Sequence, residues 1–284
     1  MITTFHHRPR TTATAALLLL GGCCDSLFYR PGDEPVPAAD ELEMAAQDLA
    51  FAAPDGPQLH GWWLPAAGES RGTVVYCHGN TGNIARHVGW VRWLPAHGFN
   101  VVVFDYRGYG RSAGTTSRPG TVADAVAAID LALARDPQRT VVYGHSLGGA
   151  IAVNAVAARP EVRAIVVEGT FPSYREIARA RIPLLGWLLQ FLVSDGDDPE
   201  DVLDRIPPRP LLVCHGTEDS IVPFWVGEAL FERAREPKTF HAADGCGHRT
   251  AWVHEGGSFE RMLVDFFATA IRAGTDDGRA GQSP

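Results

Sequence analysis

The chain has 284 residues, of which 45% are hydrophobic, and it carries a formal net charge of −8 at pH 7. This length and apolar content suffice for one large α/β domain with a substantial core. The acidic balance argues against a general nucleic-acid-binding protein, and no internal repeat indicates a solenoid.

The first 24 residues differ in kind from the rest of the chain. A basic patch at 6–10 precedes an apolar run at 13–20, and Leu20-Gly21-Gly22-Cys23 closes the segment. This order is typical of a secretory signal peptide, here residues 1–22, and the apolar run is too short for a stable transmembrane helix. Leu-Gly-Gly-Cys resembles the lipobox of bacterial lipoproteins. That resemblance implies that Cys23 is lipidated and that the exported protein is tethered to a membrane, facing the periplasm or the cell exterior. An ordinary signal peptide or a misassigned start is the alternative.

Residues 23–48 are rich in Pro, Asp, Glu and Ala, and we interpret them as a tether before the domain, which is expected over 49–273. The first elements of the domain are two strand-like stretches, 48–54 and 59–64. A turn at Asp55-Gly56-Pro57 separates them, so they predict a β-hairpin. Trp62 and Trp63 in the second strand are expected to pack on a face of the sheet rather than bind substrate.

A short continuous apolar run at 72–77 predicts a strand that is buried on both faces. It ends at the polar, glycine-containing loop His78–Asn83, and residues 84–97 then predict a helix. His78 is a candidate general base, although a structural role is the favoured interpretation.

A second buried strand, 100–104, ends at Asp105 and a glycine-rich loop. Polar loops at the carboxyl ends of parallel strands are where ligands bind in open α/β sheets. Asp105 is a candidate acid, although a charge network with Arg107 or Arg111 that braces the loop is the favoured interpretation. A helix is expected over 121–135.

Residues 140–143 predict a third buried strand, which runs into Gly144-His145-Ser146-Leu147-Gly148 and then into an Ala- and Val-rich helix at 150–158. The pattern G-x-S-x-G between a strand and a helix is typical of a sharp turn that holds a serine side chain clear of the sheet. The pattern is short and can arise by chance among 30 glycines, so the prediction depends on this strand–turn–helix context. Ser146 is therefore the candidate nucleophile.

The region 171–206, hereafter the cap segment, follows a strand at 162–167 and breaks the alternation of strands and helices. It contains a strongly apolar stretch, 182–193, that Pro183 and Gly186 interrupt. We interpret the cap segment as an insertion over the sheet that lines an apolar substrate pocket. Plain helix core is the competing interpretation.

The remaining expected elements are a strand at 210–214, a helix at 223–235, a strand at 238–241, a closing helix at 256–273 and a disordered tail at 274–284. Asp219 and His248 each lie in a loop that follows one of these strands. The cysteines show no metal-ligand spacing: Cys77 and Cys214 are expected as buried thiols, and Cys246 as loop packing. No metal site is therefore expected, and the serine chemistry described next requires no metal or organic cofactor.

A serine hydroxyl needs a base within hydrogen-bond reach, and that base needs a carboxylate to orient it. Ser146, Asp219 and His248 occur in the chain order nucleophile, acid, histidine, which is the order used by folds that carry their serine in a G-x-S-x-G turn. Other residues compete for the roles of acid and base. The alternative acids are Glu218 and Glu168, and the alternative bases are His215, His241 and His254.

Five motifs together resemble the α/β-hydrolase superfamily. They are Val-Val-Tyr-Cys-His-Gly-Asn, Asp-Tyr-Arg-Gly-Tyr-Gly-Arg-Ser, Gly-His-Ser-Leu-Gly-Gly, His-Gly-Thr-Glu-Asp-Ser-Ile-Val-Pro and Gly-Cys-Gly-His. The branch that they most resemble contains serine aminopeptidase-like, monoacylglycerol lipase-like and acyl-protein thioesterase-like hydrolases. The resemblance covers about Leu49 to Ala273 and implies an α/β-hydrolase fold: a mostly parallel central sheet with helices on both faces and a small helical cap. It is specific to the superfamily and not to a substrate.

The expected activity is that of a serine hydrolase that cleaves an ester or a thioester through an acyl-enzyme, with backbone N–H groups of Asn80 and Leu147 as the oxyanion hole. The expected partners are a small or lipid-like acyl substrate and a membrane surface, and no nucleic acid. An aminopeptidase or amidase with the same three residues is the second hypothesis. A non-catalytic binding protein on this scaffold is the third.

Overall fold

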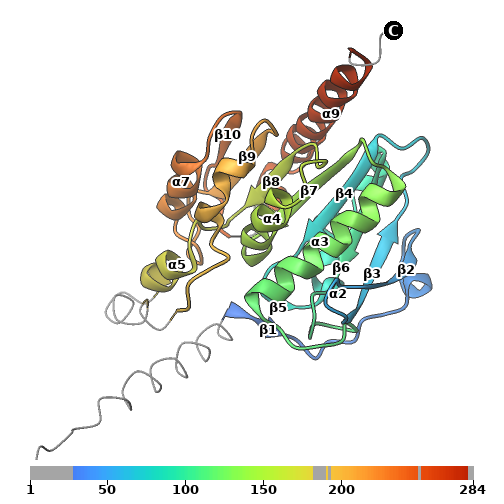
Figure 1. The fold of residues 1–284 in the computed structure, drawn as a ribbon, viewed down its shortest axis with the longest axis horizontal. Helices are drawn as coiled ribbons and strands as arrows, with labels where there is room; N and C mark the ends of the chain where they lie inside the picture. The colour runs from blue at the N-terminus through green and yellow to red at the C-terminus, as the bar shows by residue number, and fades with distance from the viewer. Residues whose placement is uncertain (1–27, 182–189, 191–192, 249–250, 281–284) are drawn as a thin grey trace, which may run out of the picture.

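The computed structural model describes residues 28–181, 190, 193–248 and 251–280. Its centre is an eight-stranded sheet in the order β10-β9-β8-β7-β4-β6-β3-β2 (Figure 1). Neighbouring strands are parallel except that β3 runs antiparallel to both β2 and β6. The strands are β1 Arg30–Pro31, β2 Gln47–Ala52, β3 Gln58–Leu64, β4 Gly72–Cys77, β5 Thr81–Gly82, β6 Phe99–Phe104, β7 Thr140–His145, β8 Ile165–Glu168, β9 Leu211–Gly216 and β10 Lys238–Ala243. The expected mostly parallel sheet and its N-terminal hairpin are confirmed.

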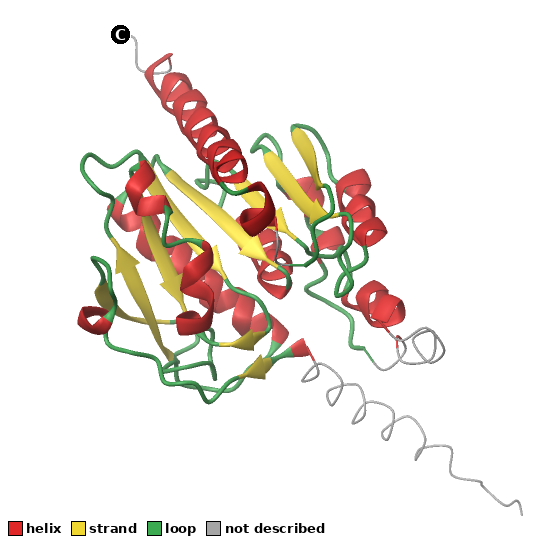
Figure 2. Cartoon of the chain, turned by 180° about the vertical axis from the view of Figure 1, so that it is seen from behind, coloured by secondary structure: helices red, strands yellow, loops and turns green. Residues whose placement is uncertain are grey.

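Helices cover both faces of the sheet, as expected (Figures 1 and 2). Side chains of α3, α4 and α7 pack in one core cluster, and side chains of α2, α8 and α9 pack in a second cluster on the opposite face. The α-helices are α2 Ile84–His87, α3 Arg118–Arg135, α4 Leu147–Ala157, α5 Tyr174–Arg181, α7 Phe224–Arg233, α8 Ala251–Glu255 and α9 Gly257–Ala280. Short 3-10 helices lie at Ala39–Glu41, Val88–Trp90, Leu94–His97, Pro199–Asp201 and Leu203–Arg205.

The central strand β4 shows why the core forms on both sides of the sheet. Successive side chains of a strand point to opposite faces. Val75 and Cys77 therefore belong to the cluster beneath α3 and α4, whereas Val74 and Tyr76 belong to the cluster beneath α9. All four are fully buried. Trp62 on β3 is also fully buried in the α9 cluster, which confirms its expected packing role.

The helix expected over 84–97 is broken. Only Ile84–His87 is α-helical, and two 3-10 turns follow it at Val88–Trp90 and Leu94–His97. Pro95 lacks the backbone N–H that an α-helix needs, and Gly98 ends the segment with a φ of 85°. The polypeptide between β5 and β6 is therefore a compact succession of turns.

The N-terminal segment differs from the expected tether where the structure describes it. Residues 28–48 pack against the domain: β1 pairs in parallel with β5, and Arg30 N donates to Asn80 O at 2.9 Å. Tyr29 is 5% exposed and Ala39 is 4% exposed. Apolar side chains in this Pro- and Asp-rich stretch bury area that the composition alone did not reveal. Residues 23–27 lie outside the described part of the chain.

The C-terminal helix is longer than expected. Helix α9 continues to Ala280, so residues 274–280 are helical rather than a disordered tail, and residues 281–284 lie outside the described residues. Phe259, Leu263 and Phe267 anchor its first half in the core. Adding residues to a helix that is already nucleated costs little, which explains the continuation into a polar sequence.

The cap segment is described only in part, because the expected apolar stretch lies largely outside the described residues at 182–189 and 191–192. The described ends are α5 and the two 3-10 turns Pro199–Asp201 and Leu203–Arg205. Asp198 joins them, since its Oδ1 accepts a hydrogen bond from Tyr174 N at 2.7 Å.

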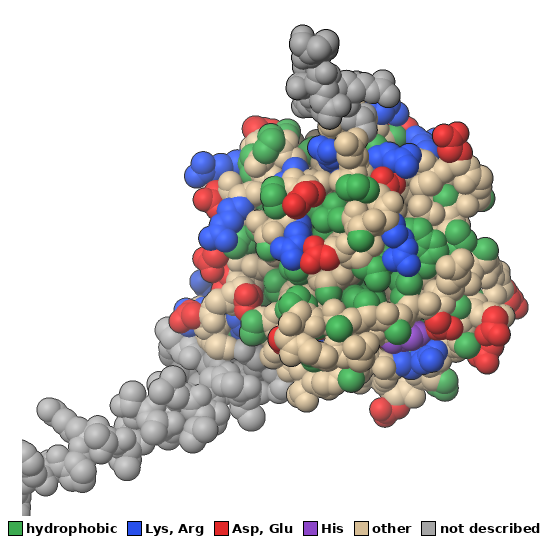
Figure 3. Space-filling view, turned by 45° about the vertical axis from the view of Figure 1, so that its right-hand side comes forward, with side chains coloured by type: hydrophobic (Ala, Val, Ile, Leu, Met, Phe, Trp, Pro, Cys, Tyr) green, Lys and Arg blue, Asp and Glu red, His purple; other side chains and the backbone are tan. Residues whose placement is uncertain are grey.

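The surface of the protein carries a mixture of charged and apolar side chains. On the face in Figure 3, acidic and basic side chains alternate with apolar ones, and neither sign of charge covers the surface. Within the described residues, no helix is both long and apolar enough to span a bilayer.

Candidate active site

Ser146 lies at the bend between β7 and α4, as the G-x-S-x-G pattern predicts. Its backbone has φ 55° and ψ −123°, in a region that residues other than glycine rarely occupy. Hydrogen bonds on both sides hold this conformation: Ser146 N donates to Glu168 O at 2.8 Å, and Gly149 N donates to Ser146 O at 2.9 Å. A strained conformation that its surroundings impose is common at functional sites.

The two glycines of the motif are required by close backbone contacts. A Cβ on Gly148 would lie 2.0 Å from Cys77 O, and a Cβ on Gly144 would lie 2.5 Å from Gly148 O. Neither position therefore has room for a side chain. Because both residues are glycines, α4 starts directly against the end of β4, and Ser146 lies beside the loop after β4.

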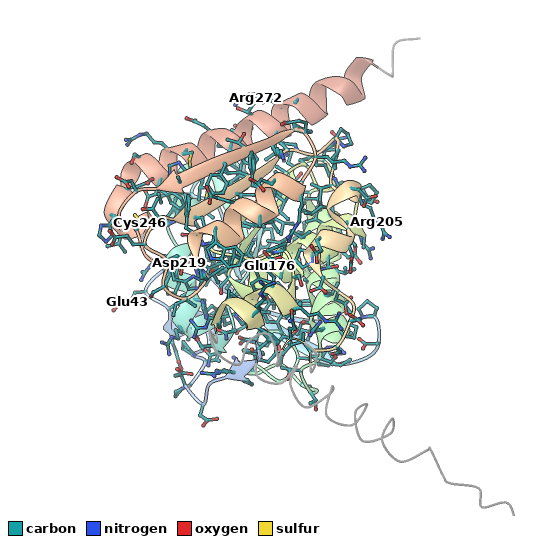
Figure 4. The ribbon with its side chains drawn as sticks, turned by 90° about the vertical axis from the view of Figure 1, so that its left-hand side faces the viewer. Glu43, Glu176, Arg205, Asp219, Cys246 and Arg272 are labelled. Carbon is teal, nitrogen blue, oxygen red and sulfur yellow. The ribbon has the colours of Figure 1, made fainter. Side chains whose placement is uncertain are left out.

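The structure brings the three expected residues of the site together. His248 Nε2 lies 2.9 Å from Ser146 Oγ, and His248 Nδ1 lies 2.7 Å from Asp219 Oδ2. Asp219 lies in the loop after β9, and His248 lies in the loop after β10. Glu218 N donates to Cys246 O at 2.9 Å, so these two loops contact each other at one end of the molecule (Figure 4). Because β9 and β10 are parallel neighbours, the loops that follow them lie at the same edge of the sheet.

The carboxylate of Asp219 is held in one orientation. Its Oδ1 accepts hydrogen bonds from Ile221 N at 2.8 Å and from Val222 N at 2.9 Å, which leaves Oδ2 to face His248. The ring of His215 lies on the same oxygen, with Nε2 at 3.3 Å. Burial by itself raises the pKa of Asp219, but hydrogen bonds from His215, His248 and the backbone outweigh it and lower the pKa well below its usual range. Asp219 is therefore ionised at neutral pH.

The alternative acids have other environments. Glu168, at the end of β8, accepts a hydrogen bond from Tyr143 Oη, and burial raises its pKa to about 7. Glu218 is exposed. Neither carboxylate occupies the position beside His248 Nδ1 that Asp219 fills.

The alternative histidines are also engaged elsewhere. His215 is buried, and its Nε2 lies 2.8 Å from Val222 O. His241 pairs with Glu255 at 2.8 Å, and His254 is exposed on α8. The contact between His215 and Asp219 was not foreseen, although their i, i+4 spacing after a strand was a signal that could have revealed it.

The expected oxyanion donors belong to segments that adjoin Ser146. Leu147 is the first residue of α4, where backbone N–H groups have no acceptor within the helix. Gly79 adjoins the serine, because a Cβ on Gly79 would lie 3.6 Å from Ser146 Cβ. Asn80 follows Gly79, and its carbonyl accepts hydrogen bonds from Arg30 N and from Tyr109 Oη, both at 2.9 Å. The loop that carries Asn80 is therefore fixed next to the nucleophile.

The expected charge network at Asp105 is wrong in its partners. Arg107 instead pairs with Asp124 at 2.8 Å and with Asp55 at 2.6 Å, and Arg111 lies 3.4 Å from Asp48. Asp105 is fully buried near the loop His78–Asn83, where its Oδ1 accepts a hydrogen bond from Ile84 N at 2.9 Å. The glycine-rich loop turns the arginines toward α3 and the hairpin, away from this carboxyl group.

The cysteines that the structure describes are buried, as expected for Cys77, Cys214 and Cys246. Within the described ranges, no group of three or more His, Cys, Asp or Glu side chains is arranged to hold a metal ion.

Comparison with known proteins agrees with the fold and with the motif set. A family model described as "Serine aminopeptidase, S33" matches residues 68–201. The uncharacterized protein YfhR of Escherichia coli (strain K12) is 35% identical over 256 residues, which cover 87% of this chain and 88% of the relative. The alpha/beta hydrolase domain-containing protein WAV2 of Arabidopsis thaliana is 32% identical and covers 79% of each chain. Among solved structures, the Pyrococcus furiosus esterase Pf2001 has a TM-score of 0.70 at 23% identity, and covers 86% of this chain and 98% of the esterase.

The sheet order, the serine at the strand–helix bend and these similarities define an α/β hydrolase. Within this superfamily, the chain belongs with the YfhR-like proteins, and its residues 68–201 match the serine aminopeptidase S33 model.

Proposed function

We propose that this protein is a serine hydrolase that cleaves a carboxylic ester or a thioester through a covalent acyl-enzyme. The observation that carries the proposal is the continuous hydrogen-bonded chain from Ser146 Oγ through His248 to the ionised Asp219. This chain provides the base that a serine hydroxyl needs at neutral pH and the carboxylate that orients the base.

The geometry supports the following sequence of steps. Asp219 accepts a hydrogen bond from the Nδ1–H of His248, which leaves Nε2 without a proton as the acceptor that faces Ser146 Oγ. Ser146 Oγ attacks the acyl carbon while Nε2 takes its proton, and the backbone N–H groups of Asn80 and Leu147 bind the oxygen on which negative charge develops. His248 then protonates the leaving alcohol or thiol. A water molecule, deprotonated by His248, attacks the acyl carbon; the bond to Ser146 Oγ breaks, His248 returns the proton to Oγ, and the acid is released. These steps require no metal or organic cofactor.

The choice of an ester over an amide is tested with a substrate panel. We expect the purified chain to hydrolyse p-nitrophenyl esters, or acyl thioesters, faster than aminoacyl anilides of matched size. The structural similarity to proteins described as esterases supports this order, whereas the description of the family model favours the reverse. Measuring kcat/KM across acyl chain lengths also defines the substrate class. Faster anilide turnover would favour the aminopeptidase hypothesis, and the absence of any turnover would favour a binding protein.

We also propose that Cys23 carries a lipid that holds the exported protein at a membrane surface, where the substrate is lipid-like. Phe28 supports this arrangement, because its ring contacts Tyr174 of α5 with centroids 5.0 Å apart. Five residues span at most about 18 Å, so a lipid on Cys23 would keep α5 close to the membrane. The cap segment and the site beside it would then face the source of acyl lipids.

The change Cys23→Ala tests the anchor. We expect it to move the full-length protein from the membrane fraction to the soluble periplasmic fraction of the expressing cells, because one lipidated cysteine supplies the attachment. Cys24→Ala is the matched control and is expected to leave the protein in the membrane fraction. Unchanged fractionation of the Cys23 variant would contradict the proposal.

A further inference from the structure

The peptide group between Gly79 and Asn80 has a hydrogen-bond partner at its carbonyl end. Its N–H belongs to Asn80 and is one of the two proposed oxyanion donors, and its C=O belongs to Gly79. Nδ1 of His78 lies 2.7 Å from Gly79 O. A carbonyl oxygen can only accept, so Nδ1 must carry the proton and donate it to the same peptide group that serves the oxyanion.

The ring of His78 is held firmly in this position. It is fully buried, it stacks on His87 with centroids 5.0 Å apart, and it contacts the ring of Tyr106 at 4.4 Å. Tyr106 Oη also donates to His78 O at 3.1 Å. The side chain therefore has little freedom to turn away from Gly79 O.

The far side of the ring faces a buried carboxyl group. His78 Nε2 lies 3.6 Å from Asp105 Oδ1, and both side chains are fully buried. Burial lowers the pKa of His78 to about 4, and burial raises the pKa of Asp105 to about 7. A neutral ring with its proton on Nδ1 presents the bare Nε2 toward Asp105. The contact with Asp105 favours this ring orientation when Asp105 is protonated, because a protonated carboxyl group presents a hydrogen toward the bare Nε2, whereas a carboxylate would repel its lone pair.

We propose that His78 is a positioning residue for the oxyanion hole: its Nδ1–H aligns and polarises the Gly79–Asn80 peptide, and Asp105 sets the orientation of its ring. This inference rests on the proposed function and assigns to the HGN segment a role in the reaction that neither the sequence nor the comparisons provide. An Asp–His pair would then stand on each side of the reacting carbonyl group. Asp219 and His248 serve the nucleophile, and Asp105 and His78 serve the oxyanion.

Two physical effects make the hydrogen bond to Gly79 O important for the rate. Accepting a hydrogen bond at the carbonyl end of a peptide strengthens its N–H as a donor, by roughly 10–30% per bond. It also fixes the direction of the N–H before charge develops, which removes the need to reorganise during the reaction. Removal of a whole oxyanion donor lowers kcat by roughly 10²–10³-fold. Loss of its alignment should therefore lower kcat by about 10–50-fold, within that limit.

The test uses two amide side chains that mimic different ring nitrogens. Asparagine at position 78 places its amide nitrogen near the position of Nδ1, whereas glutamine reaches the position of Nε2. We expect His78→Gln to lower kcat for an ester by about 10–50-fold with little change in KM, and His78→Asn to keep kcat within about 3-fold of wild type. The binding of a trifluoromethyl ketone, whose adduct with Ser146 places an oxyanion in the hole, should weaken in parallel with kcat/KM.

His87 provides the matched control. It is a buried histidine that stacks on His78, but its Nε2 contacts Thr81 O at 2.7 Å rather than the peptide of the oxyanion donor. His87→Asn should lower the midpoint of thermal unfolding and leave kcat and trifluoromethyl ketone binding within about 3-fold of wild type.

The outcomes separate this inference from the proposed function. If wild type hydrolyses esters and His78→Gln matches it in kcat and ketone binding, His78 has only a structural role and the inference is wrong. If His78→Gln fails to fold, the decision rests on His78→Asn, and a loss of kcat above 10-fold at wild-type thermal stability overturns the inference. Failure of wild type to hydrolyse any ester or thioester would instead reject the proposed function.

Discussion

Replacement of Ser146 by alanine is expected to lower kcat for an ester by about 10⁴–10⁶-fold, the range that removal of a serine nucleophile causes in enzymes of this type. The reason is that Ser146 Oγ is the hydroxyl group that lies 2.9 Å from His248 Nε2 and that attacks the acyl carbon in the proposed mechanism. The same change should abolish covalent labelling by a fluorophosphonate, measured as a mass increase on the intact protein. Folding should be almost unaffected, since alanine and serine accept the same positive φ equally poorly.

Ser173→Ala is the matched control for this experiment. Ser173 is buried to a similar degree, at 6% exposure against 8% for Ser146, but its Oγ accepts backbone hydrogen bonds at the start of α5. This variant should keep its labelling and its kcat. Labelling that survives in the Ser146 variant would assign the nucleophile to another residue and reject the proposed mechanism.

The second large effect is expected for Asp219→Asn, which should lower kcat by about 10³–10⁴-fold. The two backbone N–H groups of Ile221 and Val222 donate to the Oδ1 position, so the amide oxygen of asparagine must take that position. Its NH₂ group then faces His248 Nδ1 and donates to it. This forces the proton of the neutral ring onto Nε2, which can no longer accept the proton of Ser146. Steady-state kinetics at pH 8 measures the loss.

Glu168→Gln tests the competing assignment of the acid. Glutamine can still accept the hydrogen bond from Tyr143 Oη, so the core should tolerate the change. We expect its kcat to stay within about 5-fold of wild type, because Glu168 does not contact His248 Nδ1 in this arrangement. A loss of about 10³-fold in Glu168→Gln together with near-normal activity in Asp219→Asn would exchange the roles of the two carboxylates.

The strand–turn–helix at Ser146 was predictable because its cause is local. A run of β-branched residues, two glycines without room for a Cβ and a following small-residue helix are all adjacent in the chain. The hairpin and the central strands were predictable for the same reason, since period and continuity of apolar residues are local patterns. The acid and the histidine were found because their loops follow predicted strands in the order of this superfamily.

Other features were not predictable because distant residues decide them. Tyr29 becomes buried only when β1 reaches β5, whereas the polar, proline-containing composition of this segment by itself predicts a tether. Helix α9 extends past its apolar half because the core holds that half in place. Proximity in the sequence predicts that Asp105 pairs with Arg107 or Arg111, whereas the fold directs those arginines to Asp48, Asp55 and Asp124.

The sequence by itself determined the class of the protein and three candidate residues, because each depends on a short motif at the end of a strand. The tertiary structure decided which groups meet. Parallel strands bring the loops after β7, β9 and β10 to one edge of the sheet, so that Ser146, His248 and Asp219 form one hydrogen-bonded chain. The same packing sets His78 between Asp105 and the Gly79–Asn80 peptide. A contact between residues far apart in the chain exists only after the sheet has formed. Local sequence patterns therefore do not predict which distant residues meet or how far apart their atoms lie.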